Sequence, residues 1–273
     1  MMENKKGKIV SIVSLKGGVG KTSTVVALGA SIADMGKKVL LVDGNFSAPN
    51  LGLHLKILDP DTSIQHVLDR KANVGDAIYR CGKFDVLPAS IFYQTVRRPL
   101  VLRDKLKYLK RKYDIILVDS SPSLNSETLA AILAADEILV VATPDYPTLS
   151  VTLKAIKTAR QRGVPIIGLI LNKVHGKDFE ISEEDVEDTL EIPILAKIPH
   201  DIEMLRAVSE FTPSTDFNAN SKSSLEFRKL ASSLMGAKYI PRWFEKVFTL
   251  GGFFPNIKRQ DVNREVYYSS AFN

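Results

Sequence analysis

Short apolar runs alternate along most of this chain with longer segments in which apolar residues recur at helical spacing. Unbroken apolar runs predict strands covered on both faces, and the spaced pattern predicts amphipathic helices. Strands are expected at 9–13, 37–43, 84–88, 113–119, 137–142 and 164–171, with a last one from 194, and helices at 24–35, 62–70, 74–79, 100–112, 127–135, 149–162, 183–190 and 224–235. Such alternation predicts an α/β fold, with a mostly parallel twisted sheet and helices on both faces.

A glycine-rich segment joins the first expected strand to the first expected helix, and it reads Ser14-Leu15-Lys16-Gly17-Gly18-Val19-Gly20-Lys21-Thr22-Ser23. Small residues let backbone N–H groups converge on a phosphate, and the helix that follows adds the positive end of its dipole. Lys21 would reach the outer phosphates and the Thr22 hydroxyl would bind Mg²⁺. The usual loop has a glycine where this chain has Leu15, so the segment is a variant phosphate-binding loop with an additional lysine, Lys16.

Two of the expected strands end in an aspartate, Asp43 and Asp119. Ligands of open α/β sheets bind at the carboxyl ends of the strands, so both carboxylates are expected near the phosphate-binding loop. There they would hold Mg²⁺ or orient a water molecule. The alternative is that each aspartate only ends a strand or begins a turn.

With these motifs in this order, the chain resembles the MinD/ParA family of deviant Walker A ATPases, and it is closest in character to archaeal and bacterial MinD-like proteins. The resemblance covers residues 8 to about 236 and implies a Rossmann-like P-loop NTPase fold with ATP and Mg²⁺ as cofactors. It also implies a homodimer in which Lys16 of each copy reaches the phosphates of the other. The segment 120–124 resembles the family's switch II loop.

The resemblance assigns roles to residues that match the family's motifs. The catalytic set is Lys16, Lys21, Asp43, Asn45 and Asp119. The nucleotide-binding set is Lys16, Gly17, Gly18, Val19, Gly20, Lys21, Thr22, Ser23, Asn172, Pro199, His200 and Asp201, the last four beside the base. The metal ligands are Thr22, Asp43 and Asp119. The implied reaction is in-line attack of water on the γ-phosphate, with the lysines and Mg²⁺ offsetting negative charge.

One position departs from the family. MinD-like proteins commonly have a second aspartate two residues after the first, and this chain has Asn45 there. Asparagine keeps the shape of aspartate but cannot serve as a carboxylate base. Slow or partner-stimulated hydrolysis is therefore expected, and a nucleotide-binding scaffold with negligible turnover is the alternative.

Charge and cysteine content restrict the function further. The 273 residues carry a formal net charge of +6 with an isoelectric point of about 9.2, which permits but does not require a nucleic-acid or membrane partner. Cys81 is the only cysteine, so an intrachain disulfide is excluded and a metal-cluster carrier is disfavoured. The densest positive cluster lies within 97–112, where a solvated helical face is the default and DNA binding, as in a ParA-like partitioning ATPase, is the less favoured alternative.

Composition shifts after residue 236, so we divide the chain into an ATPase domain, 1–236, and an aromatic-rich tail, 237–273. Within the tail, 240–254 predicts an amphipathic helix that docks on an anionic membrane surface or a partner protein, or packs on the domain. No apolar run is long enough for a signal sequence or a membrane span. The expected protein is an ATP-dependent dimerising switch for spatial positioning, cytoplasmic and peripheral on the inner face of the cell membrane, with an activating protein partner.

Overall fold

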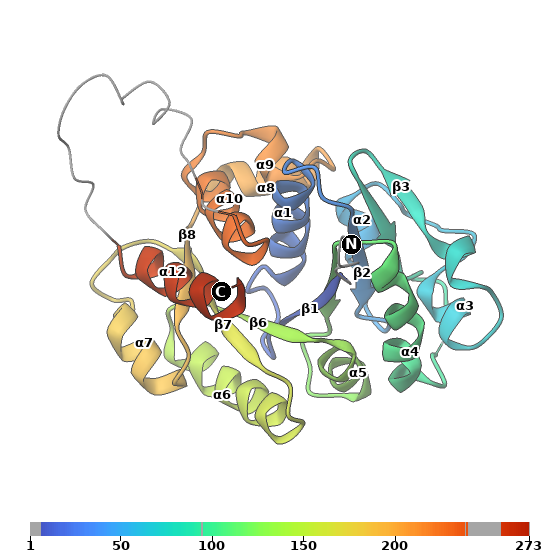
Figure 1. The fold of residues 1–273 in the computed structure, drawn as a ribbon, viewed down its shortest axis with the longest axis horizontal. Helices are drawn as coiled ribbons and strands as arrows, with labels where there is room; N and C mark the ends of the chain where they lie inside the picture. The colour runs from blue at the N-terminus through green and yellow to red at the C-terminus, as the bar shows by residue number, and fades with distance from the viewer. Residues whose placement is uncertain (1–6, 94, 238, 240–257, 273) are drawn as a thin grey trace.

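A mostly parallel β-sheet forms the centre of the molecule (Figure 1). The computed structural model describes residues 7–93, 95–237, 239 and 258–272. Its eight strands within that part of the chain have the order β3-β4-β2-β5-β1-β6-β7-β8, and every neighbouring pair is parallel except β3 and β4. The strands are β1 Lys8–Val13, β2 Val39–Gly44, β3 Tyr79–Cys81, β4 Phe84–Leu87, β5 Ile115–Ser120, β6 Glu137–Ala142, β7 Ile166–Val174 and β8 Ile194–Pro199.

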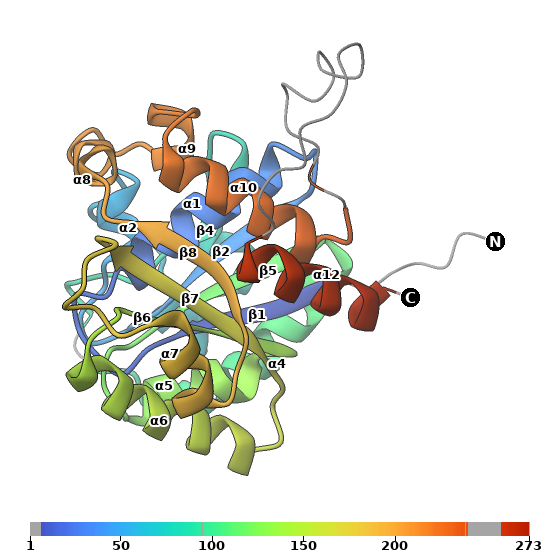
Figure 2. The same ribbon diagram turned by 90° about the vertical axis from the view of Figure 1, so that its left-hand side faces the viewer.

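Helices cover both faces of this sheet (Figures 1 and 2). One face packs under α1 (Lys21–Ala33) and α10 (Lys222–Leu234), near the short helices α2 (Leu51–His54), α8 (Ile202–Ser209) and α9 (Ser214–Phe217). The other face packs under α4 (Leu102–Lys107), α5 (Ser126–Ala134), α6 (Tyr146–Gln161) and α7 (Glu183–Leu190), with α3 (Ile64–Leu68) in the core that covers β2 and β4. The α/β architecture predicted from the sequence is confirmed.

Successive side chains of the buried strands point to opposite faces of the sheet, which explains why helices cover both faces. In β1, Val10 and Ile12 point into the core beneath α1 and α10. Their neighbour Ile9 joins the core on the opposite face, beneath α4 and α5, and Val13 joins the adjoining core beneath α6 and α7. Successive side chains of a strand point to opposite faces, so an unbroken apolar strand needs cover on both.

Two of the predicted elements are wrong, and one polar stretch contains helical segments that were not predicted. Residues 74–79 do not form one helix: a 3₁₀ turn, Val74–Ala77, leads into β3, because Gly82 with φ +58° lets that strand turn back on β4. The single helix expected over 100–112 is broken into 3₁₀ turns at Pro99–Val101 and Tyr108–Arg111 flanking α4. The polar stretch 214–224, for most of which no element was predicted, contains α9 and the start of α10.

A C-terminal helix that no sequence pattern predicted packs against β8 and α10. This helix, α12 (Arg259–Phe272), buries Tyr267 to 8% exposure and Arg264 to 5%. The Tyr267 hydroxyl donates to Glu137 at 3.1 Å and accepts from Lys8 at 2.9 Å, while Arg264 donates to the Leu195 carbonyl at 2.9 Å. The tail thus ends in an element that covers the edge strand of the sheet.

The amphipathic segment expected at 240–254 lies outside the residues that the structure describes. Among the helices of the described ranges, none combines the length and the apolar character that crossing a bilayer requires.

Candidate nucleotide-binding site

The glycine-rich segment predicted to bind phosphate joins β1 to α1 at the carboxyl edge of the sheet. Gly18 and Gly20 have φ angles of +77° and +94°, and Gly20 is the N-terminal cap of α1. These left-handed angles favour glycine and turn successive backbone N–H groups toward one concavity. A Cβ added at Gly17 or Gly18 would meet no atom within 4 Å, so the concavity is open above the loop.

Lys21 and Thr22 begin α1 and bring charge and a hydroxyl group to this concavity. Lys21 is buried at 8% exposure, and burial lowers the pKa of its ammonium, against the opposing effect of the Asp119 carboxylate. The Thr22 hydroxyl donates to Asp119 Oδ2 at 2.6 Å. The two residues therefore lie at the start of α1, at the base of the loop and facing the end of β5.

Asp43 and Asp119 are neighbours because β2 pairs with β5 in a register that places them side by side. Both carboxyl groups are fully or almost fully buried. Burial raises the pKa of Asp43 well above its usual range, and the charge of Asp119 adds to the rise. Burial likewise raises the pKa of Asp119 to about 6, although the Thr22 hydroxyl and Lys21 act against it. Two crowded carboxylates favour a cation beside them.

The oxygens available at this point fit Mg²⁺. Asp119 Oδ1 is buried and has no hydrogen-bond partner among the described residues. Asp43 Oδ1 accepts the Asn45 N–H at 3.0 Å, and its Oδ2 accepts the N–H groups of Asn50 and Leu51. Those bonds fix Asp43 and the loop after β2. Mg²⁺ at phosphate sites is held by few protein oxygens, with phosphates and water completing the shell. Thr22 and Asp119 would bind the ion directly, and Asp43, whose oxygens already accept N–H groups, would act on the ion through its water shell.

Asn45 occupies the same cavity at 5% exposure. Its side-chain Nδ2 donates to the Ala48 carbonyl, which closes the turn after β2. The amide therefore fixes the loop, and its side chain brings no carboxylate to the cavity.

The residues expected beside the base line the other end of this cavity, which has a volume of about 440 Å³. Asn172 donates from Nδ2 to the Val19 carbonyl at 2.6 Å, and its Oδ1 is buried without a partner among the described residues. An orphaned amide oxygen at a cavity wall suits an exocyclic amino group such as that of adenine. Pro199, His200 and Asp201 also line the cavity.

Asp201 has a structural role in this wall. It caps α8 by accepting the Glu203 N–H at 3.0 Å, and it accepts the Ser223 hydroxyl at 2.6 Å. Its neighbour His200 stacks on His175, with ring centroids 4.6 Å apart. The loop after β8 is thereby tied to α8, α10 and the end of β7.

Sequence reasoning missed several residues that line the cavity, among them His54, Asn50 and Lys173. The His54 Nδ1–H donates to the Asn50 carbonyl at 2.9 Å, and burial lowers the pKa of the His54 ring. Lys173 donates to the Gly18 carbonyl at 2.7 Å. Its place directly after Asn172 was the one available signal, because a lysine at a strand end beside a phosphate loop is positioned to meet negative charge.

Lys16 stands apart from the other site residues. Its ammonium lies 3.0 Å from Asp145 Oδ1 and 2.6 Å from Thr148 Oγ1, at the start of α6. The side chain is 39% exposed and does not line the cavity. Although partial burial opposes the shift, hydrogen bonds from Thr143, Lys16 and Thr148 lower the pKa of Asp145 to about 2. The structure thus holds Lys16 at the rim, outside its own phosphate concavity.

A phosphate-binding loop, a buried lysine and a hydroxyl–carboxylate pair at the end of the adjacent strand define a P-loop nucleotide-binding protein. A family profile described as an AAA domain matches residues 7–163. An ATP-binding protein of Methanocaldococcus jannaschii is 32% identical over 259 residues, which cover 92% of this chain and 97% of that protein. Together with the two MinD structures described next, these matches show that the chain belongs to the MinD/ParA family of P-loop ATPases.

Solved structures agree with this assignment. The cell division ATPase MinD of Pyrococcus furiosus superposes with a TM-score of 0.79 at 38% identity, covering 82% of this chain and 97% of that one. The septum site-determining protein MinD of Pyrococcus horikoshii, complexed with Mg-ADP, superposes with a TM-score of 0.79 at 34% identity. The match covers 84% of this chain and 96% of that one.

Proposed function

We propose that this protein is an ATP-dependent dimerising switch that hydrolyses ATP at a site shared between two copies and thereby positions cellular components. The observation that carries the proposal is the open concavity above the loop, with buried Lys21 and the Thr22–Asp119 pair at its foot. Those groups suit a nucleotide polyphosphate with its Mg²⁺. The relatives named as cell division and septum site-determining proteins support a positioning role.

Lys16 supports the shared site. Its ammonium is partly exposed and bonded to Asp145 at 3.0 Å beside the cavity, without lining it. The Lys16 ammonium therefore lies outside the phosphate concavity of its own copy and is accessible to solvent. When a second copy approaches face to face, Lys16 would leave Asp145 and meet the partner's phosphates. The negative charge of bound ATP would offset the loss of the ion pair between Lys16 and Asp145.

Hydrolysis at this site would depend on positioning more than on a protein base. Lys21 and Lys16 would offset charge on the phosphates, while Asp43 and Asp119 would hold the metal and its water molecules. Asn45 bonds to the Ala48 carbonyl and brings no carboxylate to the cavity. Slow turnover, stimulated by an activating protein partner, follows from that arrangement.

The test of the shared site is the oligomeric state measured by size-exclusion chromatography with light scattering, in ATP and in ADP. Wild-type protein is expected to be dimeric in ATP and monomeric in ADP. The Lys16→Ala variant should stay monomeric while still binding ATP. Lys157→Ala, which removes an exposed lysine of α6, is the matched control and should behave as wild type. Equal dimerisation of wild type and Lys16→Ala would refute the shared site.

We also propose that 240–254 docks reversibly on an anionic membrane surface. Its sequence places Trp243, Phe244, Val247 and Phe248 largely on one helical face. Because α12 packs on the domain, the test should leave that helix in place. Trp243→Ser with Phe248→Ser should lower co-sedimentation with anionic liposomes in ATP, and recovery equal to that of wild type would refute membrane docking.

DNA binding remains the second candidate function because part of the basic cluster is exposed. The exposed members are Arg97, Arg98, Arg103, Lys107, Arg111 and Lys112. Lys110, by contrast, is paired with Asp136 at 2.7 Å. If this face binds DNA, affinity in ATP should fall steeply with salt concentration, because phosphate contacts release counterions. A flat salt response would exclude it.

A further inference from the structure

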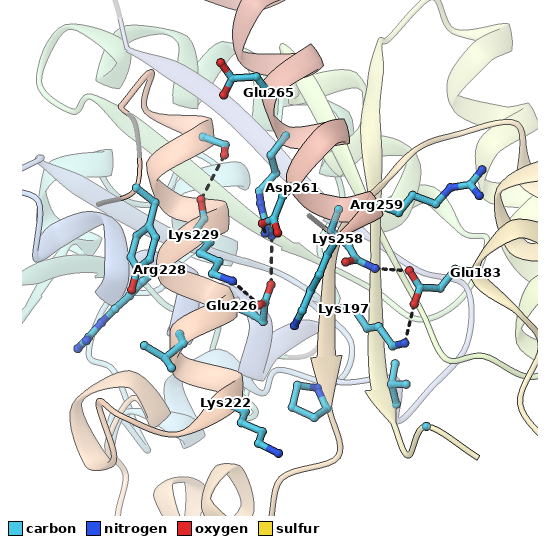
Figure 3. A pocket seen from close by; sticks show the side chains of 18 of the residues that line it. Glu183, Lys197, Lys222, Glu226, Arg228, Lys229, Lys258, Arg259, Asp261 and Glu265 are labelled. Atoms are coloured by element: carbon cyan, nitrogen blue, oxygen red, sulfur yellow. Dashed lines mark hydrogen bonds and ion pairs between the residues drawn. The ribbon is translucent and has the colours of Figure 1, made fainter. Parts of the chain in front are cut away.

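A second and larger cavity, of about 1460 Å³, lies between α7, β8, α10 and α12 (Figure 3). Pro199 lines both this cavity and the nucleotide cavity, so the end of β8 forms a wall between them. The second cavity is bordered at its rim by Ala237 and Lys258. None of the groups expected to bind ATP through phosphate or metal contacts lines it.

Positive charge exceeds negative charge in the walls of this cavity. The acidic members are Glu183, Glu226, Asp261 and Glu265. The cationic members are Lys197, Lys222, Arg228, Lys229, Lys258, Arg259 and Arg264. A concave site with low-dielectric walls focuses the field of such a surplus and raises the local concentration of anions.

Several of the cations are already neutralised by the acids. Lys197 pairs with Glu183 at 2.5 Å, and Lys229 pairs with Glu226 at 2.9 Å. Arg264, buried at 5% exposure, also reaches Glu226 at 3.2 Å. These pairs fix the walls: Glu183 is held by Lys197 from β8, and Glu226 is held from both α10 and α12. They leave the site rigid without using all of its positive charge.

Three cations of this cavity, Arg228, Lys222 and Lys258, have no ion pair with any residue of the described ranges. Arg228 donates to the Thr215 carbonyl at 3.4 Å, which leaves the ammonium groups of Lys222 and Lys258 for a ligand. Figure 3 shows Lys258 extending from the α12 side into the hollow near Glu226, and Lys222 at the lower end of the hollow, where it extends downward from the first turn of α10. Both lysines line the cavity, so a molecule with more than one anionic group could meet ammonium groups from two separate elements.

We infer that this cavity is a second anion site that takes a phosphate-bearing molecule, with Lys222 and Lys258 as its principal ligands. Compact ammonium groups suit the oxygens of a terminal phosphate, and the volume exceeds that of the nucleotide cavity. The phosphate has two sources, a free phosphorylated molecule or the headgroup of a lipid. The lipid source rests on the membrane docking proposed above, whereas the free source does not.

Calorimetric titration of the full chain with inorganic pyrophosphate tests the site, with Mg-ADP saturating the nucleotide cavity. A titration with ADP alone first establishes that the nucleotide cavity is filled, so failure of nucleotide binding is seen separately. Pyrophosphate should bind one to one. Lys222→Gln with Lys258→Gln should weaken it about 25-fold, roughly fivefold for each lysine. Lys154→Gln with Lys157→Gln, the matched loss of exposed charge on α6, should leave it within about twofold.

Vesicles of phosphatidylcholine with and without phosphatidic acid form the second arm. If the ligand is a lipid headgroup, phosphatidic acid should increase vesicle binding of wild type and of the α6 control by more than it increases that of the cavity variant, which keeps 240–254. Pyrophosphate binding without a phosphatidic acid effect would identify the free source. The inference is overturned if the cavity variant matches wild type with both probes, or if neither probe binds to wild type.

Discussion

Asn45→Asp is the substitution that tests most directly how this site limits hydrolysis. Asn45 is 5% exposed, donates to the Ala48 carbonyl, and gives its backbone N–H to Asp43 at 3.0 Å. Aspartate at this position would remove the Nδ2 donor and place a carboxylate oxygen against the Ala48 carbonyl oxygen. It would also add a second carboxylate near Asp43. The Ala48 carbonyl keeps its bond from Asn50 Nδ2 at 2.9 Å, so the cost comes from the lost Asn45 bond and from the new carboxylate facing Ala48 and Asp43. Together these should cost about 2 kcal/mol of stability without nucleotide. That loss corresponds to a fall of about 5 °C in Tm for a domain of this size.

Catalysis should change in the opposite direction. A positioned carboxylate that accepts a proton from the attacking water contributes about 10²-fold to 10⁴-fold in favourable sites. Restoring only part of that effect predicts a rise in kcat of at least about tenfold, or about 1.4 kcal/mol in the barrier. The assay is phosphate release at saturating Mg-ATP, beside thermal unfolding without nucleotide. A variant that is destabilised as expected but turns over no faster than wild type would refute the role given to this position.

Three further predictions follow from the geometry. Gly20→Ala should raise the Kd for a fluorescent ADP at least about tenfold, since Gly20 has φ +94° and a Cβ there would lie 2.4 Å from Asn172 Nδ2; an unchanged Kd would contradict this. Tyr267→Phe should cost about 1 kcal/mol in urea unfolding, because its hydroxyl bonds at 2.9 and 3.1 Å are lost. The pKa of Asp145 in the folded protein is lowered to about 2, so its contribution to the free energy of unfolding is complete above about pH 4 and is lost as pH falls toward 2. The Asp145→Asn variant should lack that part of the pH dependence of unfolding, and a pH profile identical to that of wild type would refute the prediction.

The elements that sequence predicted well carry strong local signals. The strand ending at Asp119 is an unbroken apolar run followed by an acid, and the helix Glu183–Leu190 begins and ends where its pattern does. Both aspartates were correctly expected beside the loop, because parallel strands end at one edge of the sheet. Here the local pattern and the global topology require the same structure.

What could not be predicted lies in contacts between distant parts of the chain. Lys16 meets Asp145 129 positions later, and Asn172 reaches Val19 across 153 positions. Tyr267 bonds to Lys8 across 259 positions. Periodicity within a window of residues contains no information about such pairs, because each partner would look the same if it faced solvent. The prediction of a helix over 74–79 failed for a related reason, because pairing of β3 with β4 overrode a weak helical pattern.

The position of α12 also changes what membrane docking would mean. The segment 240–254 lies between Ala237 and Lys258, and both of these residues border the lysine-lined cavity. An extended chain spans at most about 3.5 Å per residue, so the chain length limits the two ends of the segment to about 10 Å from Ala237 and about 14 Å from Lys258. A membrane bound by 240–254 would thus be tethered near the cavity at both ends of the segment. A tail without α12 would be tethered at Ala237 alone, whereas the second attachment at Lys258 would also bring an anionic surface close to Lys222 and Lys258.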